Sequence, residues 1–295
     1  MPELPEVETV RRSLEPVIVD RLITSVRGDS FPDVMGPGGL DRADGLLGRR
    51  IVALDRRGKY LIGRLDDGSA LLIHLRITGQ LVLASRNDPP LRFEHLVIGL
   101  AGPQDRTGSD EELPVELRFA DQRRFGRVLH IEPDAVPRLF GQLGPEPLAP
   151  GFTVASLADA LRGRRAPVKN VLLDQRRVAG LGNIYVDEAL FRAGINPLHP
   201  AGLLDDEAVA RLHNAIVVVL SEALDRRGTT FSSFRDGYGR EGENVGNLRV
   251  YGRGRHGLPC PVCGTPLDLI RLAGRSSSYC PSCQPSPVVP VPKRT

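Results

Sequence analysis

The chain of 295 residues lacks several features that mark common classes of protein. It has no apolar run of about 18 residues, the length that a helix needs to cross a bilayer, so no membrane partner is expected. Its first residues are acidic and include prolines, whereas a secretory signal begins with basic and then apolar residues. No repeat with a period of about 20 to 50 residues is visible. We therefore expect a cytosolic protein, and a monomer, because no stretch indicates an oligomer interface.

A strong excess of charge is also missing. The 39 Lys and Arg against 36 Asp and Glu give a net charge of only +3, too small to indicate a nucleic-acid partner by itself. The basic residues nevertheless gather in a few stretches, mostly in the second half: DQRRFGR, LRGRRAPVK, LRVYGRGRH and LIRLAGR. Taken alone, each stretch is better explained as an ordinary solvated face.

Cysteine is scarce, and its placement is informative. The four cysteines have the spacing Cys-x2-Cys-x16-Cys-x2-Cys near the C-terminus, which in a reducing compartment argues against disulfides. Two close pairs of thiolates match tetrahedral zinc, and the spacer is long enough for a β-hairpin. A closed four-cysteine site has no open coordination position, so we predict one structural zinc ion. Its predicted ligands are Cys260, Cys263, Cys280 and Cys283.

The predicted hairpin carries basic side chains. Arg271 and Arg275 lie between the two cysteine pairs. A rigid basic finger of this kind suits a phosphate backbone. A zinc ribbon that serves only protein contacts is the alternative, and these residues alone leave it open.

The opening MPELPEVETV places Pro2 beside the acid Glu3. An α-amine has a reference pKa of about 7.7 to 8.0 against about 10.4 for lysine, so it is the better nucleophile near neutral pH. A secondary amine that attacks a sugar C1′ gives an iminium ion directly. This chemistry requires removal of Met1, which the small Pro2 favours. The alternative is that PELPE is only the entry to a helix, with Pro5 in the first turn.

The order of patterns along the chain predicts a multidomain α+β protein. Apolar positions at helical spacing after Pro5 predict a first helix, and short β-rich runs from about Leu22 to Glu132 predict a β-sandwich or barrel. In LDDGSALL, Asp67 and Gly68 predict a hairpin turn. Helical periodicity follows a proline-rich linker. The predicted boundaries are 1–143 for the β-rich domain, 144–152 for the linker, 153–246 for the helical domain, 247–285 for the zinc finger and 286–295 for a disordered tail.

The stretch VAGLGNIYVDEAL predicts a glycine turn between two helices. Gly180 and Gly182 flank the turn, and Asn183 is the predicted N-cap of the second helix. A helix N-terminus with unpaired N–H groups can bind a phosphate. An ordinary glycine turn between packed helices is an equally good interpretation.

Together and in this order, these motifs resemble the formamidopyrimidine-DNA glycosylase family. The resemblance runs from Met1 to about Gln284 and rests on PELPEVET, RRGKYL, HLRITGQL, DQRRFG, LLDQRRVAGLGNIYVDEALFRAGINP and GRSSSYCPSCQ. It implies an N-terminal β-sandwich with a flanking helix, a helix-two-turn-helix domain and a C-terminal β-hairpin zinc finger. It also implies a bacterial enzyme of base excision repair that binds damaged double-stranded DNA between its two halves.

The resemblance assigns catalytic roles to four residues. Pro2 would be the nucleophile that forms a Schiff base with the sugar, and Glu3 would assist opening of the sugar ring. Lys59 would be the proton donor in β-elimination, and Arg275 would assist the later δ-elimination. A nucleophile beside an acid is also the minimum that cleavage of a glycosidic bond requires.

The resemblance further implies a DNA-binding surface. Ile77, Arg123 and Phe125 match a wedge that fills the stack after a nucleotide is extruded. The remaining predicted DNA contacts are His95, Arg164, Lys169 and Asn183. Ile77 departs from the usual methionine and is stiffer at χ1, so its fit to different opposite bases differs. For His95 and Arg164, an ordinary structural or solvated role without a DNA contact is the alternative.

A second departure lies in FRDGYGREGENVGNL, at 234–248, which lacks the family's GYF-type signature for a loop over the everted base. The stretch fits either a mobile lid or a solvated linker.

Three functions compete at this stage. The leading hypothesis is a bifunctional DNA glycosylase and AP lyase that removes oxidised purines such as 8-oxoguanine and formamidopyrimidines. An endonuclease VIII-like enzyme for oxidised pyrimidines is disfavoured, because that branch usually begins PEGPE and this chain has Leu4. A non-catalytic DNA-damage binder would be expected to lack Pro2, Glu3 or Lys59, and all three are present.

Overall fold

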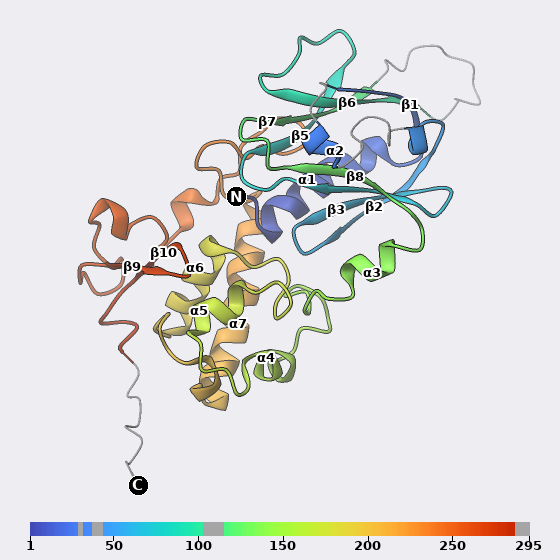
Figure 1. Cartoon of the computed structure of the whole chain (residues 1–295). Coiled ribbons are helices and arrows are strands. Elements are labelled where there is room, and N and C mark those ends of the chain that lie inside the picture. Colours follow the sequence, from blue (N-terminus) through green and yellow to red (C-terminus); the bar gives the residue numbers. More distant parts are fainter. Residues whose placement is uncertain (29–31, 37–43, 103–114, 287–295) are drawn as a thin grey trace. The chain divides into compact units, whose positions relative to one another are not determined.

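The structure is a computed structural model that describes residues 1–28, 32–36, 44–102 and 115–286 (Figure 1). The acidic stretch at 103–114 and residues 287–295 of the predicted tail lie outside this range. Within it, no helix combines the length and apolarity needed to cross a membrane.

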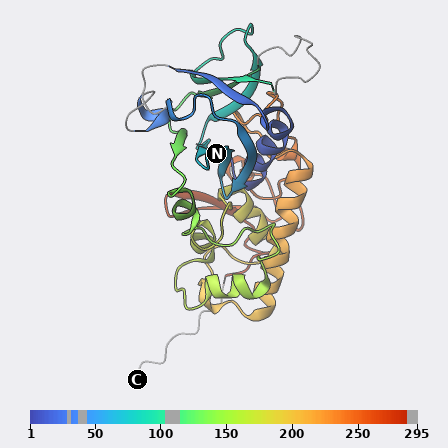
Figure 2. The same ribbon diagram turned by 90° about the vertical axis from the view of Figure 1, so that its right-hand side faces the viewer.

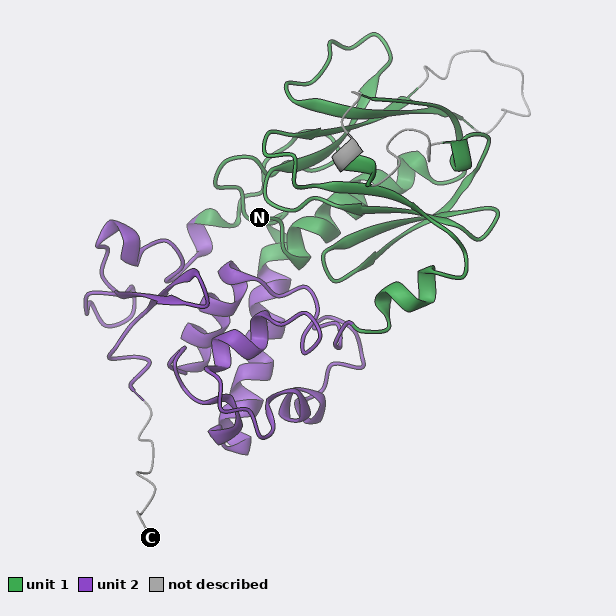
Figure 3. Cartoon of the chain, in the orientation of Figure 1, with its two compact units in different colours: residues 1–142, 223–245 green, residues 143–222, 246–295 purple. Residues whose placement is uncertain are grey.

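The chain forms two compact units (Figure 3). Unit 1 comprises residues 1–142 and 223–245, and unit 2 comprises residues 143–222 and 246–295. Residues 223–245 thus join the N-terminal unit although they follow the helical segments in sequence. The predicted domain boundaries stay a prediction, because the units group residues by proximity alone.

Unit 1 carries the predicted strands. Its described elements are α1 (Leu4–Ile18), β1 (Leu22–Gly28), α2 (Pro32–Met35), β2 (Ile51–Arg57), β3 (Tyr60–Leu65), β4 (Ala70–His74), β5 (Gly79–Ser85), β6 (Glu94–Ala101), β7 (Val115–Asp121), β8 (Arg127–Ile131) and α3 (Val136–Phe140). The first helix and the β-rich stretch are confirmed. The hairpin at Asp67 and Gly68 is also present between β3 and β4, and Gly68 has φ +85°, which favours glycine.

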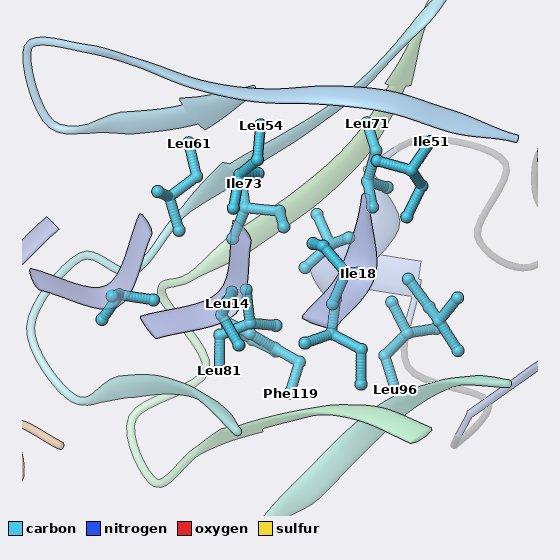
Figure 4. Packing of buried hydrophobic residues seen from close by; sticks show 14 of the residues in the cluster. Leu14, Ile18, Ile51, Leu54, Leu61, Leu71, Ile73, Leu81, Leu96 and Phe119 are labelled. Carbon is cyan, nitrogen blue, oxygen red and sulfur yellow. The ribbon is translucent and has the colours of Figure 1, made fainter. Parts of the chain in front are cut away.

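The strands form two antiparallel sheets with the orders β1-β6-β7-β5 and β2-β3-β4-β8. Alternating apolar residues of both sheets meet in one core. Figure 4 shows Leu14 and Ile18 of α1 among side chains of the two sheets, such as Leu71 above and Leu96 below. The sandwich with a flanking helix is therefore confirmed, and α1 is fixed by the burial of its apolar stripe.

Unit 2 carries the helical segments and the finger. Its elements are α4 (Val154–Leu161), α5 (Val168–Leu173), α6 (Asn183–Ala193), η2 (Ala201–Leu203), most of α7 (Asp206–Asp225), the end of η3 (Asn244–Asn247), η4 (Gly254–His256), β9 (Asp268–Leu272) and β10 (Arg275–Tyr279). Figure 2 shows α7 as one uninterrupted helix. The predicted helical domain and the hairpin of the finger are confirmed. Hairpin strands β9 and β10 pair in register from Leu272 and Arg275 outward.

Candidate active site and nucleic-acid interface

The residues that directly follow Met1 are buried. Pro2 is buried and Glu3 is only 2% exposed, while Met1 is half exposed. Glu3 is the N-cap of α1 in extended conformation, and its backbone N–H donates to Glu6 Oε2 at 2.8 Å. This is half of a capping box, which fixes the angle at which the chain enters the helix.

Glu6 also reaches the returning segment of unit 1. Its Oε1 accepts the backbone N–H of Thr229 at 2.8 Å, and the side chain is 1% exposed. A Cβ on Gly228, which has φ +80°, would meet Glu6 Oε1 at 2.9 Å, so only glycine fits there. One buried carboxylate therefore ties the predicted nucleophile to residues 228–229.

Lys59 lies in the two-residue turn between β2 and β3, next to Gly58 with φ +57°. Its side chain is 7% exposed. The lysine charge acts on His74 at the end of β4, whose ring packs edge-on against Tyr60 at 4.6 Å between centroids. The predicted catalytic lysine is thus held in a tight turn beside a buried histidine.

His74 is a neutral imidazole in this environment. Burial lowers its pKa to about 3, and the charges of Arg76 and Lys59 act in the same direction. The Arg76 backbone N–H donates to Nδ1 at 3.0 Å, so Nε2 carries the proton and is a donor. The sequence does not single out His74, because an isolated histidine at the end of an apolar strand is usually a core residue.

The three predicted wedge residues lie in two loops of unit 1. Ile77 is half-buried in the turn between β4 and β5, and Arg123 and Phe125 are exposed between β7 and β8. The Arg123 guanidinium lies 4.9 Å from the centroid of the Phe125 ring. Both loops join at Thr78, whose Oγ1 accepts the Arg123 N–H at 3.1 Å. The structure therefore brings these three residues to adjacent loops.

His95 is 4% exposed, and its Nε2 lies 2.8 Å from the carbonyl oxygen of Asp121. It borders a pocket of about 220 Å³ with Arg27 and Glu94. The ring of His95 is thus held against the end of β7, and its predicted DNA contact stays a prediction.

The segment after α7 is held in place within unit 1. The Gly237 N–H donates to Ser13 Oγ of α1 at 2.8 Å, and its carbonyl accepts the Leu83 N–H of β5 at 2.8 Å. Asp236 is 1% exposed and accepts the N–H groups of Tyr238 and Arg240. This part of 234–248 is therefore a docked turn, and it exposes Tyr238.

Arg275 lies in unit 2 at the start of β10. It borders a groove of about 540 Å³ between the hairpin and the N-terminus of α6. The groove is also lined by Arg255, Arg271, Asn183 and Ser276. Three guanidinium groups on one rigid hairpin and its neighbour create a positive surface, as an anionic polymer would require. Arg164, in the loop between α4 and α5, is exposed as well.

The prediction that Asn183 is the N-cap of α6 is wrong. Gly182 is the N-cap, in extended conformation, and Asn183 is the first helical residue. The Gln175 side chain holds the turn before α6 in the position that makes Gly182 the N-cap. Gln175 Oε1 accepts the Gly180 N–H at 2.9 Å, and Gln175 Nε2 donates to the Leu181 carbonyl oxygen. Asn183 Nδ2 instead donates to the carbonyl oxygen of Ser276 at 2.9 Å.

Lys169 does not lie on an accessible surface. Its side chain is 0% exposed, and Nζ donates to Asp187 Oδ1 at 2.7 Å and to Ser276 O at 3.0 Å. Asp187 also accepts from the Ser277 hydroxyl and the Ser278 N–H. Burial raises the pKa of Asp187 to about 6, against the opposing charge of Lys169. In this structure Lys169 joins β10 to α6, and its predicted phosphate contact stays a prediction.

The four cysteines form one cluster. The ligand atoms of Cys260, Cys263, Cys280 and Cys283 all lie within 4.8 Å of one another. Sulfur atoms at the corners of a zinc tetrahedron with Zn–S bonds of about 2.3 Å are separated by about 3.8 Å. The observed S–S separations between the pairs are 3.4, 3.5 and 3.9 Å. The donor set and its spacing fit one structural zinc ion, as predicted.

Family models match three successive parts of the chain. They are the formamidopyrimidine-DNA glycosylase N-terminal domain at residues 1–128, the formamidopyrimidine-DNA glycosylase H2TH domain at residues 143–235, and the zinc finger found in FPG and IleRS at residues 257–285. The chain belongs to the formamidopyrimidine-DNA glycosylase family.

Similar proteins extend the match to nearly the whole length. The formamidopyrimidine-DNA glycosylase of Thermomicrobium roseum is 44% identical over 97% of this chain and 99% of its own, and that of Moorella thermoacetica is 47% identical over 92% and 95%. A Lactococcus lactis FPG mutant in complex with Fapy-dG containing DNA has a TM-score of 0.86 at 35% identity. It covers 97% of this chain and 100% of its own. Membership of the family also confirms the zinc finger and the fold class.

The sequence of this formamidopyrimidine-DNA glycosylase family member does not predict the roles of two buried acids, Glu6 and Asp121. From the sequence, Glu6 is only a favourable charge in the first turn of a helix, and Asp121 is only the end of a strand. Their partners come from distant segments. For Glu6 there is one indication in the sequence, because Glu3 and Glu6 have the spacing of a capping box.

Proposed function

We propose that this chain is a bifunctional DNA glycosylase and AP lyase that excises oxidised purines, 8-oxoguanine and formamidopyrimidines, from double-stranded DNA. The curated relatives are named formamidopyrimidine-DNA glycosylases, and the Lactococcus lactis structure contains Fapy-dG in its DNA. The observation that carries the proposal is the position of Pro2 and Glu3 at a helix entry that Glu6 fixes, in the same unit as Lys59.

The reaction begins at the Pro2 nitrogen once Met1 is removed. The lone pair attacks C1′ of the damaged nucleotide, the C1′–N bond to the base breaks, and the base departs with the proton that the Pro2 nitrogen loses. Glu3 protonates the sugar ring oxygen as the ring opens, which leaves an iminium ion between Pro2 and C1′. The buried site favours this step, because charges interact more strongly where water is excluded.

Elimination then cleaves the DNA strand. The iminium group acidifies the C2′–H bond, so a proton is lost there and the C3′–O bond to phosphate breaks in β-elimination. Lys59 supplies the proton for the departing group. A second loss, of the 5′ phosphate, follows by δ-elimination with help from Arg275. Hydrolysis of the iminium ion releases Pro2.

DNA binding uses basic and apolar groups of both units. Ile77, Arg123 and Phe125 fill the space of the extruded nucleotide, and His95 and Arg164 contact phosphates. Asn183 and the arginines beside Arg275 bind the strand at the finger. The working form is a monomer in the bacterial cytosol.

Oxidised pyrimidines are a second candidate substrate class. A Lactococcus lactis FPG that is 36% identical to this chain has been solved in complex with oxidised pyrimidine containing DNA. Pyrimidine lesions therefore belong in the same assay. We expect excision of 8-oxoguanine to exceed that of dihydrothymine.

Trapping of the covalent intermediate tests the proposal. The protein, shown by intact mass to begin at Pro2, is incubated with 8-oxoguanine or dihydrothymine duplexes and borohydride. The expected result is an adduct on the purine lesion that is lost when Met1 is retained and falls sharply in Pro2→Gly. Absence of any adduct with correctly processed protein would overturn the enzymatic proposal and favour a non-catalytic damage binder.

A further inference from the structure

Asp121 occupies the centre of the two loops that carry Ile77, Arg123 and Phe125. It ends β7 and is 1% exposed. On β5, the residue paired with Asp121 is Gly79, which directly follows the turn of Ile77. The acid therefore lies under both loops at once, in the edge pair of its sheet.

Each oxygen of Asp121 binds a different part of these loops. Oδ1 accepts a hydrogen bond from the hydroxyl of Thr78 and another from the N–H of Arg123 at 3.2 Å. Oδ2 accepts the Gly126 N–H at 2.7 Å. A carboxylate offers about four acceptor positions, so these three donors use most of its capacity.

The backbone of Asp121 adds further contacts. Its carbonyl oxygen accepts the Arg124 N–H at 3.2 Å and lies 2.8 Å from His95 Nε2. Its own N–H donates to the Phe93 carbonyl at 2.9 Å. One residue thus connects both wedge loops to the start of β6.

The loops hold backbone conformations that side chains rarely adopt. Arg76, Arg124 and Phe93 have φ of 56°, 59° and 63°, although none is glycine. Such conformations persist only where the surroundings over-determine them, and they gather at functional sites. Arg124 and Phe93 are hydrogen-bonded to the backbone of Asp121, and these bonds supply part of that constraint.

The packing allows little adjustment. A Cβ on Gly126 would lie 2.4 Å from the Phe119 ring and 3.2 Å from Asp121 Oδ2. A Cβ on Gly79 would lie 2.4 Å from the Leu75 carbonyl oxygen. The backbone of both loops is therefore tightly packed beside Asp121, at its paired residue Gly79 and at Gly126.

We propose that Asp121, acting with Thr78, is a positioning residue that holds Ile77, Arg123 and Phe125 as one preformed wedge. The inference rests on the proposed function, because it concerns how the enzyme extrudes a nucleotide. A wedge that enters the base stack must keep its shape while the neighbouring bases tend to restack. Side chains that are already held in place lose little conformational freedom when the DNA binds. Thr78 connects the loops directly, since its hydroxyl donates to Asp121 and accepts from Arg123.

The test compares variants that remove these bonds with one that preserves them. Thr78→Val removes the hydroxyl at nearly constant volume, and Thr78→Ser keeps it. Asp121→Asn keeps the shape of the side chain but replaces one acceptor with a donor. Thr24→Val is the matched control, because its Oγ1 donates to the Gly99 carbonyl within the same sheet, on β1 and β6.

Two substrates separate extrusion from chemistry. The first is a duplex with 8-oxoguanine next to 2-aminopurine, whose fluorescence rises on unstacking. The second is a single strand with a preformed abasic site, which needs no extrusion. Single-turnover excision and the fluorescence rise are followed on the duplex, and borohydride trapping is followed on the single strand.

Thr78→Val is expected to slow both the fluorescence rise and excision at least tenfold on the duplex. Trapping on the single strand should stay within twofold of the unmodified protein, and Thr78→Ser should recover to within threefold on both. Asp121→Asn should show the same selective loss, and Thr24→Val should match the unmodified protein. The unmodified protein must itself excise 8-oxoguanine; if it does not, the proposed function fails and not the inference.

Two results would overturn the inference. One is a folded Thr78→Val protein that unstacks and excises like the unmodified protein. The other is a folded Thr78→Val protein that loses trapping on the single strand as much as excision on the duplex, since that marks a general disturbance of the site. If Asp121→Asn does not fold, the two Thr78 variants still decide.

Discussion

Glu6 Oε1 accepts the backbone N–H of Thr229 at 2.8 Å across a sequence separation of 223 residues. The other oxygen of the same carboxylate accepts the N–H of Glu3, next to Pro2. The geometry of the predicted nucleophile therefore depends on the segment that returns after α7. This relationship explains why residues 223–245 belong to unit 1.

Substitution of Glu6 by glutamine should disturb both ends of this link. Glutamine keeps one acceptor oxygen, but its NH2 group replaces the other. That NH2 group then faces the N–H of Glu3 or of Thr229, so two donors oppose each other and one hydrogen bond is lost. A buried donor without its acceptor costs about 1 to 3 kcal/mol. We expect Glu6→Gln to lower the free energy of urea-induced unfolding by that amount and to slow borohydride trapping about tenfold. Glu15→Gln, at a half-buried position of α1 where the carboxylate pairs with Arg11, is the control, and equal behaviour of both variants would contradict the prediction.

His74 makes stability depend on pH. Its pKa is about 3 in the folded protein against about 6.5 when unfolded, so between these values the unfolded chain binds the extra proton. Stability is fully present above pH 6.5 and falls as pH decreases, by about 1.4 kcal/mol per unit from this group. His74→Gln cannot take up a proton, so its unfolding free energy should fall less between pH 6.5 and 5. Parallel curves for the two proteins in urea titrations would refute this assignment.

Zinc content provides a third prediction. We expect one zinc ion per chain by metal analysis, and its removal by a chelator should weaken DNA binding at least tenfold, because the metal closes the base of the β9–β10 hairpin. Cys263→Ala should lose the metal. Ser282→Ala, a substitution between two of the ligands, should retain it. A chelated protein that binds DNA with unchanged affinity would argue that the finger folds without metal.

Lys169 offers a direct contrast between a structural and a DNA-binding role. Lys169→Met leaves Asp187 buried without its cation, and breaking a buried pair in this way costs about 3 to 5 kcal/mol. Removal of both charges in Lys169→Met with Asp187→Leu should recover part of that loss. The dependence of DNA affinity on salt should not change, whereas a lost phosphate contact would lower its logarithmic slope by about 1. A lower slope with unchanged stability would support the predicted phosphate contact instead.

Much of the fold can be predicted from the sequence because it depends on local patterns. The apolar spacing after Pro5 defines α1, the pair Asp67 and Gly68 defines a turn, and the four cysteines define the finger. Each of these features arises within a short stretch, where period, turn chemistry or ligand spacing determines the outcome.

The features that cannot be predicted from the sequence are those that depend on partners far away along the chain. A lysine in a helical, basic stretch predicts a surface charge, and only the position of Asp187 shows that Lys169 is buried. The sequence predicts Asn183 as the N-cap of α6, but Gln175 holds the preceding turn and Gly182 takes that position. The role of Asp121 likewise follows from three loops that meet only in the folded sandwich.

The discontinuity of unit 1 has a consequence for biosynthesis. At about 5 to 20 residues per second, a ribosome needs roughly 10 to 45 s to pass from Glu6 to Thr229, which are 223 residues apart. During that interval the Glu6 carboxylate has no Thr229 to bind, so the start of the polypeptide is still open to an aminopeptidase. Removal of Met1, which the proposed chemistry requires, can therefore precede formation of the hydrogen bond between Glu6 and Thr229.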